Sequence, residues 1–362
     1  MAGLSQLGNS LYRGDVSHNI VGRRKAWYLV SAILIILSIA TLGVRGLNLG
    51  IEFKGGAEFS VPLTVANDES VSQARETVLA AGETPSTVTI IGGDTIRIQT
   101  PALSTEASNA LSAALADSFA VEEANIKVQL VGPSWGDEVT QNALRALLVF
   151  LVLVAIFLSI YFEWQMAIAA LAALAHDVLI TVGIYALSGF EVTPASVIGF
   201  LTILGYSLYD TVVVFDKVKE NTKGIHGGSR TTYSEAANLA LNQTLVRSIN
   251  TSIVALLPVL SILVVGVSLL GVGTLNDLAL ALFVGMLVGT YSSIFVATPF
   301  LCQMKERAAE NIALAKRVQA RRKGGDAVND VKPEISIGAP IVSSAGPRQQ
   351  RVKKTRSGRS GK

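Results

Sequence analysis

The sequence predicts an α-helical membrane protein with six transmembrane helices and one extracytoplasmic α+β domain. Half of the 362 residues are hydrophobic and only 16% are charged, whereas soluble domains carry about 25% charged residues. Six runs are apolar over the length of about 20 residues that a membrane helix needs. A polar stretch of about 90 residues, enough for one modest core, separates the first two runs. These observations argue against an ordinary soluble enzyme and against a disordered chain.

The six apolar runs are the predicted spans. The first follows Arg23, Arg24 and Lys25, as a secretory signal would, but no small-residue cleavage site follows it, so we expect a retained span. The predicted spans are Ala26–Val44, Ala146–Phe162, Met166–Leu187, Ala195–Phe215, Thr251–Leu270 and Leu278–Leu301.

The distribution of lysine and arginine predicts which parts face the cytoplasm. Four basic residues precede the first span, and the tail after the last span has fifteen basic against five acidic residues. Residues 47–140 carry thirteen acidic against four basic residues and are expected outside. The predicted organisation is a cytoplasmic N-terminus (1–25), the first span (26–44), the extracytoplasmic α+β domain (45–143), the bundle of five further spans (144–305) and a basic, largely disordered cytoplasmic tail (306–362) that starts with a basic helix over Glu306–Lys323.

The polar stretch has the pattern of a small α+β domain. Alternating apolar residues predict strands, residues on a 3.6-residue period predict helices, and a Gly-Gly-Asp turn predicts a hairpin. The resulting order β-α-β-β-α-β is that of the ferredoxin-like fold. The predicted elements are strand Ala57–Thr64, helix Ser70–Ala81, strands Thr87–Ile91 and Thr95–Thr100, helix Ser104–Phe119 with Ser104 as its N-cap, and strand Ile126–Val131.

No sequence motif indicates an enzyme. The P-loop, the His-Glu-x-x-His motif and the Gly-x-Ser-x-Gly motif do not occur. One cysteine, Cys302, excludes a disulfide framework within the chain and any cysteine-rich metal site, and three histidines leave little for a His-based centre. We therefore expect no nucleotide hydrolysis, no cofactor and no metal.

Ionisable residues inside the predicted spans are the candidates for function, because each costs roughly 2.5–3.5 kcal/mol to insert. Asp210 lies inside the fourth span, about one to two turns from its cytoplasmic end. Arg247 enters the fifth span from the same side, so the two side chains are expected to be able to pair. An apposed arginine keeps a carboxylate ionised, and its departure favours proton uptake. The pair predicts a proton-carrying carboxylate; the alternative is a static packing bridge.

Further polar residues in the spans extend this prediction. His176 and Asp177 lie midway along the third span, where they either continue a polar path from Asp210 or simply bond within their own surroundings. Asp216 is expected as a solvated helix end at the membrane edge. Residues around Asp210 that are small or hydroxylated, and so let a helix or water approach, are Gly205, Ser207 and Thr211.

At these residues the chain resembles SecF, a family of subunits of the bacterial protein-export machinery. The most specific match is the stretch Gly205–Asp216, which contains Tyr206 and Asp210. The other matching stretches are Gly50–Gly56 with Glu52, Phe53, Gly55 and Gly56, then Val131–Ser134, and Asn242–Leu245 followed by Arg247 and Ser248. Small departures from the family pattern are Tyr209 in place of Asn, Lys54 in place of Thr or Ser, and Glu52 in place of Asp.

The resemblance, which covers residues 20–305, implies a half-size RND-type bundle that pairs with SecD and uses the proton gradient. It implies action with the SecYEG channel, and indirectly with the SecA motor, in late translocation and release of secreted polypeptides. In that scheme Asp210 accepts protons and Arg247 controls it. The expected surroundings are SecD, SecYEG, the translocating polypeptide and the lipid of the bacterial cytoplasmic membrane, without nucleic acid.

Two other readings of the sequence stay open. Half of an RND-type exporter of small molecules or lipids predicts an apolar ligand pocket in the outside domain, and usually a fused second half. A scaffolding membrane subunit predicts that Asp210→Asn and Arg247→Met leave activity unchanged. The long motif around Asp210 argues against the exporter, and the intramembrane charges argue against the scaffold.

Overall fold

Six helical segments in the described part of the chain are long and apolar enough to cross a membrane, which confirms the predicted number of spans. The structure is a computed structural model that describes residues 17–265 and 273–323. The spans are α2 (Arg24–Arg45), α6 (Pro133–Tyr161), α7 (Trp164–Ser188), α8 (Pro194–Thr222), α9 (Tyr233–Val265) and a last segment made of α10 (Gly273–Ser292), a π-helix (Ser293–Ala297) and α11 (Thr298–Glu306).

Several helices extend beyond the apolar runs that predicted them. Helix α6 begins at Pro133 rather than Ala146, and proline at a first helical position is pre-organised for a helix. Helix α9 begins at Tyr233 rather than Thr251, and its predicted end at Leu270 lies outside the described residues. Hydropathy finds only the apolar part of a helix, so polar turns at either end escape it. One consequence is that Arg247 lies inside α9 instead of at its start.

The α+β part has the predicted ferredoxin-like order. Its four strands form an antiparallel sheet in the order β3-β4-β2-β5, with the hairpin turn at Gly92 and Gly93, whose φ angles of 66° and 82° suit a tight hairpin turn. Ser104 caps its helix as expected, because its side chain accepts a hydrogen bond from the Ala107 N–H. The elements are β2 (Gly56–Pro62), α4 (Asp68–Ala80), β3 (Thr87–Ile91), β4 (Thr95–Thr100), α5 (Thr105–Phe119), a 3₁₀ turn (Glu123–Asn125) and β5 (Lys127–Val131).

The two faces of this sheet have different chemistry, because successive strand residues point to opposite sides. Phe59 on β2 and Ile98 on β4 face the helices α4 and α5 and are fully buried with Leu111 and Leu115. The residues that alternate with these along each strand point to the opposite face of the sheet, toward the helical bundle. That second face carries Glu58 on β2 and Arg97 and Gln99 on β4.

A short parallel ladder joins the α+β part to the bundle. β1 (Asn48–Leu49), which directly follows α2, pairs with β6 (Glu191–Val192), which connects α7 to α8. The Gly50 N–H continues the ladder by donating to the Val192 carbonyl at 3.0 Å. These two strands could not be predicted from the sequence, because two residues carry no detectable periodicity. The next element is the one-turn helix α3 (Ile51–Lys54).

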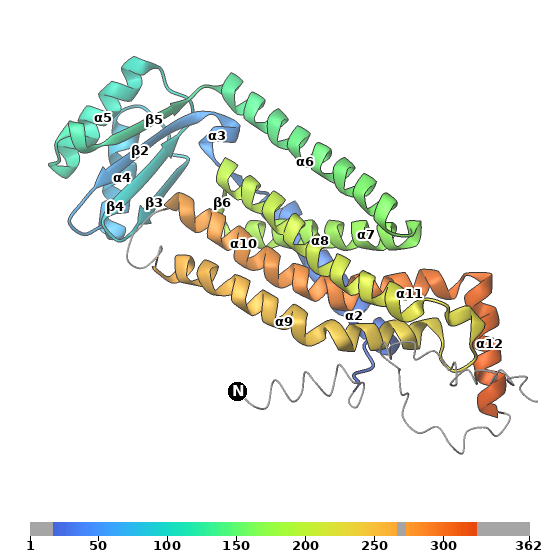
Figure 1. Ribbon diagram of the computed structural model, residues 1–362. Helices are drawn as coiled ribbons and strands as arrows, with labels where there is room; N and C mark the ends of the chain where they lie inside the picture. Colours follow the sequence, from blue (N-terminus) through green and yellow to red (C-terminus); the bar gives the residue numbers. More distant parts are fainter. Residues whose placement is uncertain (1–16, 266–272, 324–362) are drawn as a thin grey trace, which may run out of the picture.

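The sheet and helix α12 (Ala309–Lys323) lie at opposite ends of the bundle (Figure 1). Helix α12 confirms the predicted basic helix, and it is held near the 3₁₀ turn Ile225–Gly227 by Arg317, which donates to the His226 carbonyl. Residues 324–362, where the sequence predicts disorder, lie outside the described residues. The same end carries the 3₁₀ turn Val21–Arg23 that leads into α2.

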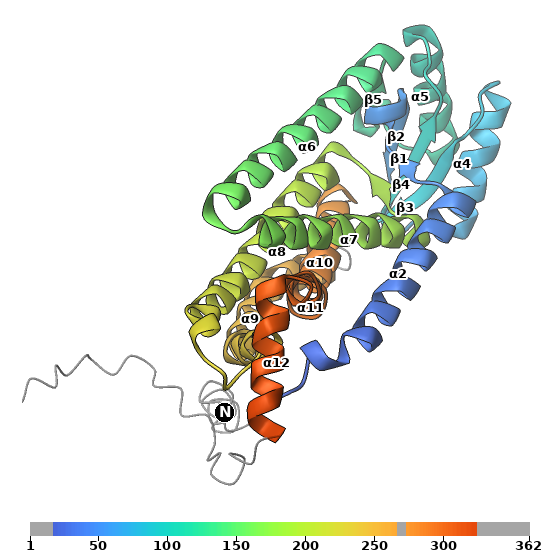
Figure 2. The ribbon, with the colours of Figure 1, turned by 90° about the vertical axis from the view of Figure 1, so that its right-hand side faces the viewer.

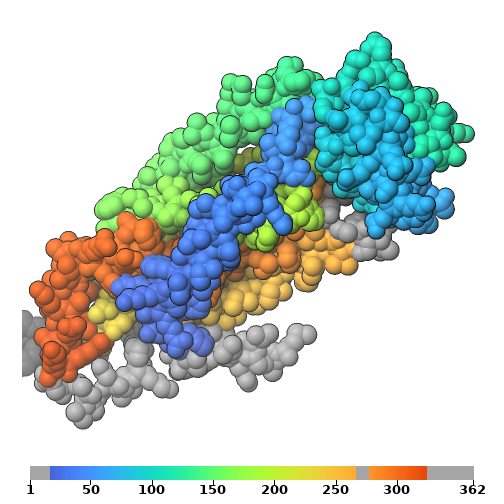
Figure 3. Space-filling model, turned by 180° about the vertical axis from the view of Figure 1, so that it is seen from behind, coloured from blue at the N-terminus to red at the C-terminus, as the bar shows by residue number. Residues whose placement is uncertain are grey.

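Helices α2 and α6 lie at the periphery of the bundle (Figure 2), and α2 runs across its surface from the α12 end to the α+β part (Figure 3). In each of these two helices only 11% of the 18-residue apolar stretch is buried, against 56% in α7. Helix α2 approaches α7 closely at Gly183, where any side chain would overlap Ser38. Exposed apolar side chains on α2, α6 and α9 are what a membrane protein presents to lipid or to another subunit.

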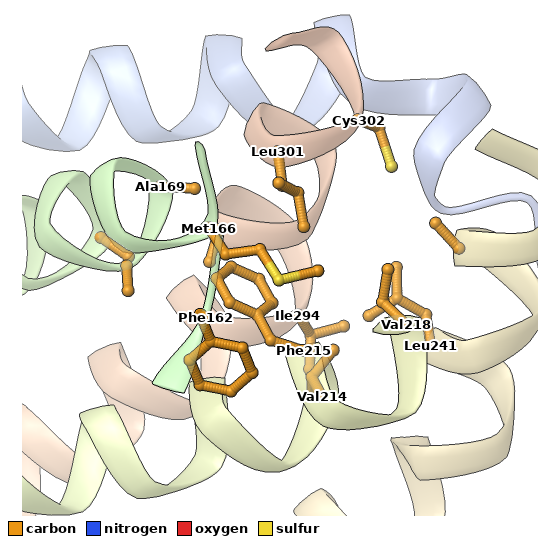
Figure 4. Packing of buried hydrophobic residues seen from close by; sticks show 14 of the residues in the cluster. Phe162, Met166, Ala169, Val214, Phe215, Val218, Leu241, Ile294, Leu301 and Cys302 are labelled. Carbon is orange, nitrogen blue, oxygen red and sulfur yellow. The ribbon is translucent and has the colours of Figure 1, made fainter. Parts of the chain in front are cut away.

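The largest apolar core fills the end of the bundle nearer α12. Phe162, Met166, Phe215, Ile294 and Leu301 converge there from several helices (Figure 4). Side chains of this kind pack without polar partners and exclude water. This dry layer borders the polar residues described next.

Candidate functional site

Asp210 lies in the interior of the bundle on α8, with 5% of its surface exposed. Hydroxyl groups from two other helices reach its carboxylate. Ser248 on α9 donates to Oδ1 at 2.6 Å, and Ser293, the first residue of the π-helix, donates to Oδ2 at 2.5 Å. Neutral donors stabilise a carboxylate without cancelling its charge. The carboxylate is thus buried beside two hydroxyl donors that carry no charge of their own.

Asp177 forms a second buried site on α7, with 3% of its surface exposed. Its Oδ2 accepts hydrogen bonds from Ser207 on α8 at 2.5 Å and from Ser292 on α10 at 2.8 Å. Its Oδ1 lies 3.0 Å from His176 Nδ1. The other ring nitrogen of His176, Nε2, is buried without a hydrogen-bond partner among the described residues. The predicted His176-Asp177 pair is thus a buried polar contact, in the same bundle as Asp210.

Arg247 does not pair with Asp210 in this structure, contrary to the sequence-based expectation. Its side chain is exposed and its Nη2 lies 3.4 Å from the Tyr209 hydroxyl. Consecutive residues of a helix point about 100° apart, so when Ser248 points inward to Asp210, the preceding Arg247 points outward. There it lines an open hollow of about 510 Å³ on the outer side of α8 and α9, together with Asp216.

The other residues of the α8 motif have separate places. Ser207 and Thr211 are buried, and Ser207 serves Asp177. Tyr206 packs among apolar residues of α9 and α10, with its hydroxyl 3.4 Å from Ser252. Asp216 is exposed, as expected, but it lies inside α8, six residues before that helix ends at Thr222, and not at a helix end. The sequence predicts that a helix or water can approach Gly205, and the structure shows open space there, because a Cβ on Gly205 would meet no described atom within 4 Å.

The close helix contact of α8 comes instead from glycines on α10. A Cβ on Gly289 would lie 2.8 Å from the Ser207 Cβ, and one on Gly285 would overlap Ile203. Small residues at this spacing let two helix backbones approach. The approach brings Ser207 and Ser292 to the same carboxylate.

The motif Glu52, Phe53, Gly55, Gly56 lies at the joint between the α+β part and the bundle. Gly55 has φ +75°, and a Cβ there would lie 3.0 Å from the Cα of Pro133, the first residue of α6. A Cβ on Gly56 would lie 2.6 Å from the Thr100 carbonyl oxygen. Phe53 packs toward the β6 connection. The two glycines are required because backbone segments pass each other at this point.

A matched pair of glycine substitutions tests this joint. A Cβ on Gly136 of α6 would lie 2.7 Å from the Phe53 carbonyl oxygen, whereas one on Gly132 would meet only Ser134 at 4.0 Å. We expect Gly136→Ala to cost about 1–3 kcal/mol by overpacking, more than the gain of about 1 kcal/mol in helix propensity. Gly132→Ala should cost less than Gly136→Ala, because Gly132 meets no close atom and loses only the preference for glycine over alanine at the N-cap of α6. Thermal unfolding of the two purified variants in detergent measures this, and equal midpoints would contradict the close contact.

A cluster of charged residues fastens the second face of the sheet to the bundle. Arg97 forms an ion pair with Glu191 at 2.7 Å, with side-chain exposures of 15% and 4%. Gln99 Nε2 donates to both Glu191 at 2.8 Å and Glu58 at 2.9 Å. Glu191 therefore joins β6, which lies between α7 and α8, to the four-stranded sheet. Sequence reasoning missed it, because a glutamate in a short loop has no pattern.

Glu52 borders this cluster, and its protonation gives a pH-dependent prediction. Burial raises the pKa of Glu52 above its ordinary value of 4.5, and the carboxylates of Glu191 and Glu58 act in the same direction, while its backbone N–H and Arg97 oppose them. The native state thus holds this proton more tightly than the unfolded state does. The stability that this provides is full below pH 4.5 and is lost as the pH rises through the higher native pKa.

Glu52→Gln should therefore become more stable relative to the parent chain as the pH rises from about 4 to about 7. The measurement is the thermal midpoint in detergent across that range. Glu122→Gln, at an exposed position of the same domain, is the matched control. A constant difference between Glu52→Gln and the parent chain would show that Glu52 titrates normally.

Within the described ranges, no three His, Cys, Asp or Glu side chains come together as a possible metal site. We assign no metal or cofactor role to any residue. Sequence reasoning quoted Ser248 only as part of a matching stretch and missed Ser292 and Ser293, so it assigned none of the three to a carboxylate. The only available signal was the presence of hydroxyls in apolar spans, and many such serines bond only to their own helix, as Ser261 does.

Comparison with known proteins places the chain in a family. The family model described as protein export membrane protein SecD/SecF, C-terminal, matches residues 111–307, more than half of the chain, and the SecD/SecF GG motif matches residues 40–65. The chain belongs to the SecF family of protein translocase subunits. The second match includes Gly55 and Gly56, whose packing is described above.

The relatives extend over most of the chain. Protein translocase subunit SecF of Streptomyces coelicolor is 50% identical over 90% of this chain and 87% of its own length. SecF of Mycobacterium tuberculosis H37Rv is 44% identical over 87% and 73%. The crystal structure of SecDF from Thermus thermophilus superimposes with a TM-score of 0.71 at 32% identity, over 81% of this chain and 39% of that longer chain. This SecF-family chain is accordingly a multi-pass membrane protein.

Proposed function

We propose that this chain is the SecF half of a SecD–SecF pair that uses the proton motive force to promote late translocation and release of secreted polypeptides. The observation that carries the proposal is the buried carboxylate of Asp210 on α8, which accepts hydrogen bonds from the hydroxyls of Ser248 on α9 and Ser293 of the π-helix. Such a group inside a membrane is expensive to keep without a function. The relatives are named protein translocase subunit SecF, which agrees with this proposal.

Pairing with a SecD-like subunit is supported by the fused relative. In the Thermus thermophilus protein named SecDF, this chain matches 39% of the length, which leaves room for a second half. The exposed apolar faces of α6 and α9 are surfaces that such a half can cover. We further propose that the pair acts at the SecYEG channel, and through it with SecA and the translocating polypeptide.

The proposed location is the bacterial cytoplasmic membrane, with both termini in the cytoplasm. Helix α12 carries Arg321, Arg322 and Lys323 in its last turn and lies at the end of the bundle opposite the acidic α+β part. Basic segments stay on the cytoplasmic side. The α+β part then faces outward, where emerging polypeptide passes. We propose no enzymatic activity and no nucleotide site, since the energy comes from protons.

Within this scheme Asp210 takes up the proton, Asp177 and His176 belong to the same polar path, and Arg247 controls Asp210. Control by Arg247 requires a rotation or tilt of α9, because its side chain now points outward beside Tyr209. A proton that crosses 100 mV releases about 2.3 kcal/mol from the electrical term. A bias of this size shifts a two-state equilibrium by tens-fold.

The test is isolation of the tagged full-length chain from its native membrane in mild detergent, with identification of bound proteins by mass spectrometry. We expect a SecD-like six-span partner together with SecYEG. The untagged chain, treated in the same way, is the control. Recovery of copies of this chain alone, or of an envelope-spanning efflux assembly, would overturn the proposal and favour an RND-type exporter.

A further inference from the structure

Two adjacent serines connect the two buried carboxylates. Ser292 ends α10 and donates to Asp177 on α7, while Ser293 opens the π-helix and donates to Asp210 on α8. Consecutive helical residues point about 100° apart, so one dipeptide serves two neighbouring helices. Short π-helical segments within α-helices are frequent at functional sites. Here the segment begins at the residue that contacts Asp210.

We propose that Ser292 and Ser293 couple Asp177 to Asp210, so that the bundle contains two interdependent proton-binding carboxylates instead of one. The coupling deepens the proposed proton-driven function, on which its role in export rests. It also assigns to the π-helix junction a link to Asp210 that is separate from the control by Arg247.

Each serine hydroxyl has two acceptors within reach. Ser292 Oγ lies 2.8 Å from Asp177 Oδ2 and 3.2 Å from the Gly289 carbonyl oxygen. Ser293 Oγ lies 2.5 Å from Asp210 Oδ2 and 3.1 Å from the Thr290 carbonyl oxygen. A hydroxyl has one hydrogen to donate. It donates to the carboxylate when that group is ionised, and it turns to the backbone carbonyl when the carboxyl group is protonated.

The turn of one hydroxyl affects the other because both acceptor carbonyls belong to the same helical turn. Gly289 and Thr290 are adjacent in the last turn of α10, which leads into the π-helix. At the other end of the π-helix, Thr298 Oγ1 donates to the Ser293 carbonyl at 3.3 Å. Donation into these carbonyls competes with the helical hydrogen bonds around them. Protonation of one carboxylate thus changes the helix that holds the donor of the other.

The charged and titratable groups around the pair are few. His176 on α7 contacts Asp177 and stacks on Tyr291, with ring centroids 6.1 Å apart, and Tyr291 directly precedes Ser292. The contacts from α8 and α9 are the hydroxyls of Ser207 and Ser248. In the described part of the chain neither carboxylate has a lysine or arginine partner. The gain or loss of a proton at one carboxylate therefore changes the proton affinity of the other, with little compensation from opposite charges.

Infrared titration of the full-length chain in lipid vesicles tests the coupling without an export assay. Asp177→Asn and Asp210→Asn assign the C=O bands of the two protonated carboxyl groups. We expect Ser293→Ala, which removes a hydroxyl that contacts Asp210 and the Thr290 carbonyl, to move the titration midpoint of the Asp177 band by at least about half a pH unit. Ser293→Thr should restore the midpoint, because it keeps the hydroxyl. Ser261→Ala is the control, because the hydroxyl that it removes donates to the Leu257 carbonyl of its own helix.

The proposal is overturned if Ser293→Ala moves the Asp210 band alone, or if Asp177 does not change protonation between about pH 4 and about pH 9. In the assembled translocase, Ser292→Ala and Ser293→Ala should each lower gradient-driven export about tenfold, as the loss of a hydrogen bond to a charged group does, with gradient-independent export unchanged. A coupling seen by infrared without any gradient-driven export in the parent chain would refute the proposed function and leave the coupling intact.

Discussion

Asp210→Asn is expected to reduce gradient-dependent stimulation of protein export to the level of membranes that lack the chain. Asparagine has the size of aspartate and still accepts the hydrogen bond of Ser248 or Ser293 at its remaining oxygen. It cannot bind and release a proton. Folding, membrane insertion and partner binding should therefore be retained, while the energy input is lost.

The measurement compares export into inverted membrane vesicles with and without an imposed proton gradient. Asp216→Asn is the matched control, since Asp216 is a carboxylate on the same helix α8 but is exposed. We expect it to behave as the parent chain does. Normal stimulation by a well-inserted Asp210→Asn protein would remove Asp210 from the proposed proton path.

Glu191→Ala is expected to have the largest effect on stability. The side chain of Arg97 is 15% exposed and that of Glu191 is 4% exposed, so loss of the glutamate leaves a largely buried guanidinium without its carboxylate partner. Breaking a buried ion pair in this way costs about 3–5 kcal/mol. The Gln99 amide also loses one of its two acceptors. The sheet should then be held to the bundle only by the β1–β6 ladder and the glycine joint.

Thermal unfolding in detergent and hydrogen exchange at β4 and β6 measure this effect. Glu220→Ala is the control: it breaks the exposed Lys217–Glu220 contact, in which the glutamate is 64% exposed, and should change stability by less than about 0.5 kcal/mol. The double variant Arg97→Met with Glu191→Leu should recover most of the loss, because apolar side chains can replace a buried pair. A Glu191→Ala protein as stable as the parent chain would show that the ion pair does not hold the joint.

The elements that sequence predicted best are those with a local cause. Spans follow from hydropathy alone, and the β-α-β-β-α-β order follows from strand alternation, helix periodicity and a Gly-Gly turn. Strands β3 and β4 have the predicted bounds, and Ser104 is the N-cap that its position indicated. Helix ends were predicted less well at α6 and α9, where polar turns continue an apolar helix beyond the bilayer-length run.

The sequence by itself determined that the chain crosses a membrane six times, carries a small α+β domain and keeps an aspartate at position 210 inside a span. Only the tertiary structure decided which side chains meet there. Arg247 points outward, serines of other helices contact Asp210 instead, and Glu191 pairs with Arg97 to join the sheet to the bundle. The physical reason is that composition and periodicity fix an element and its depth, whereas contacts depend on the rotation and approach of helices, which are set by packing between residues distant in sequence.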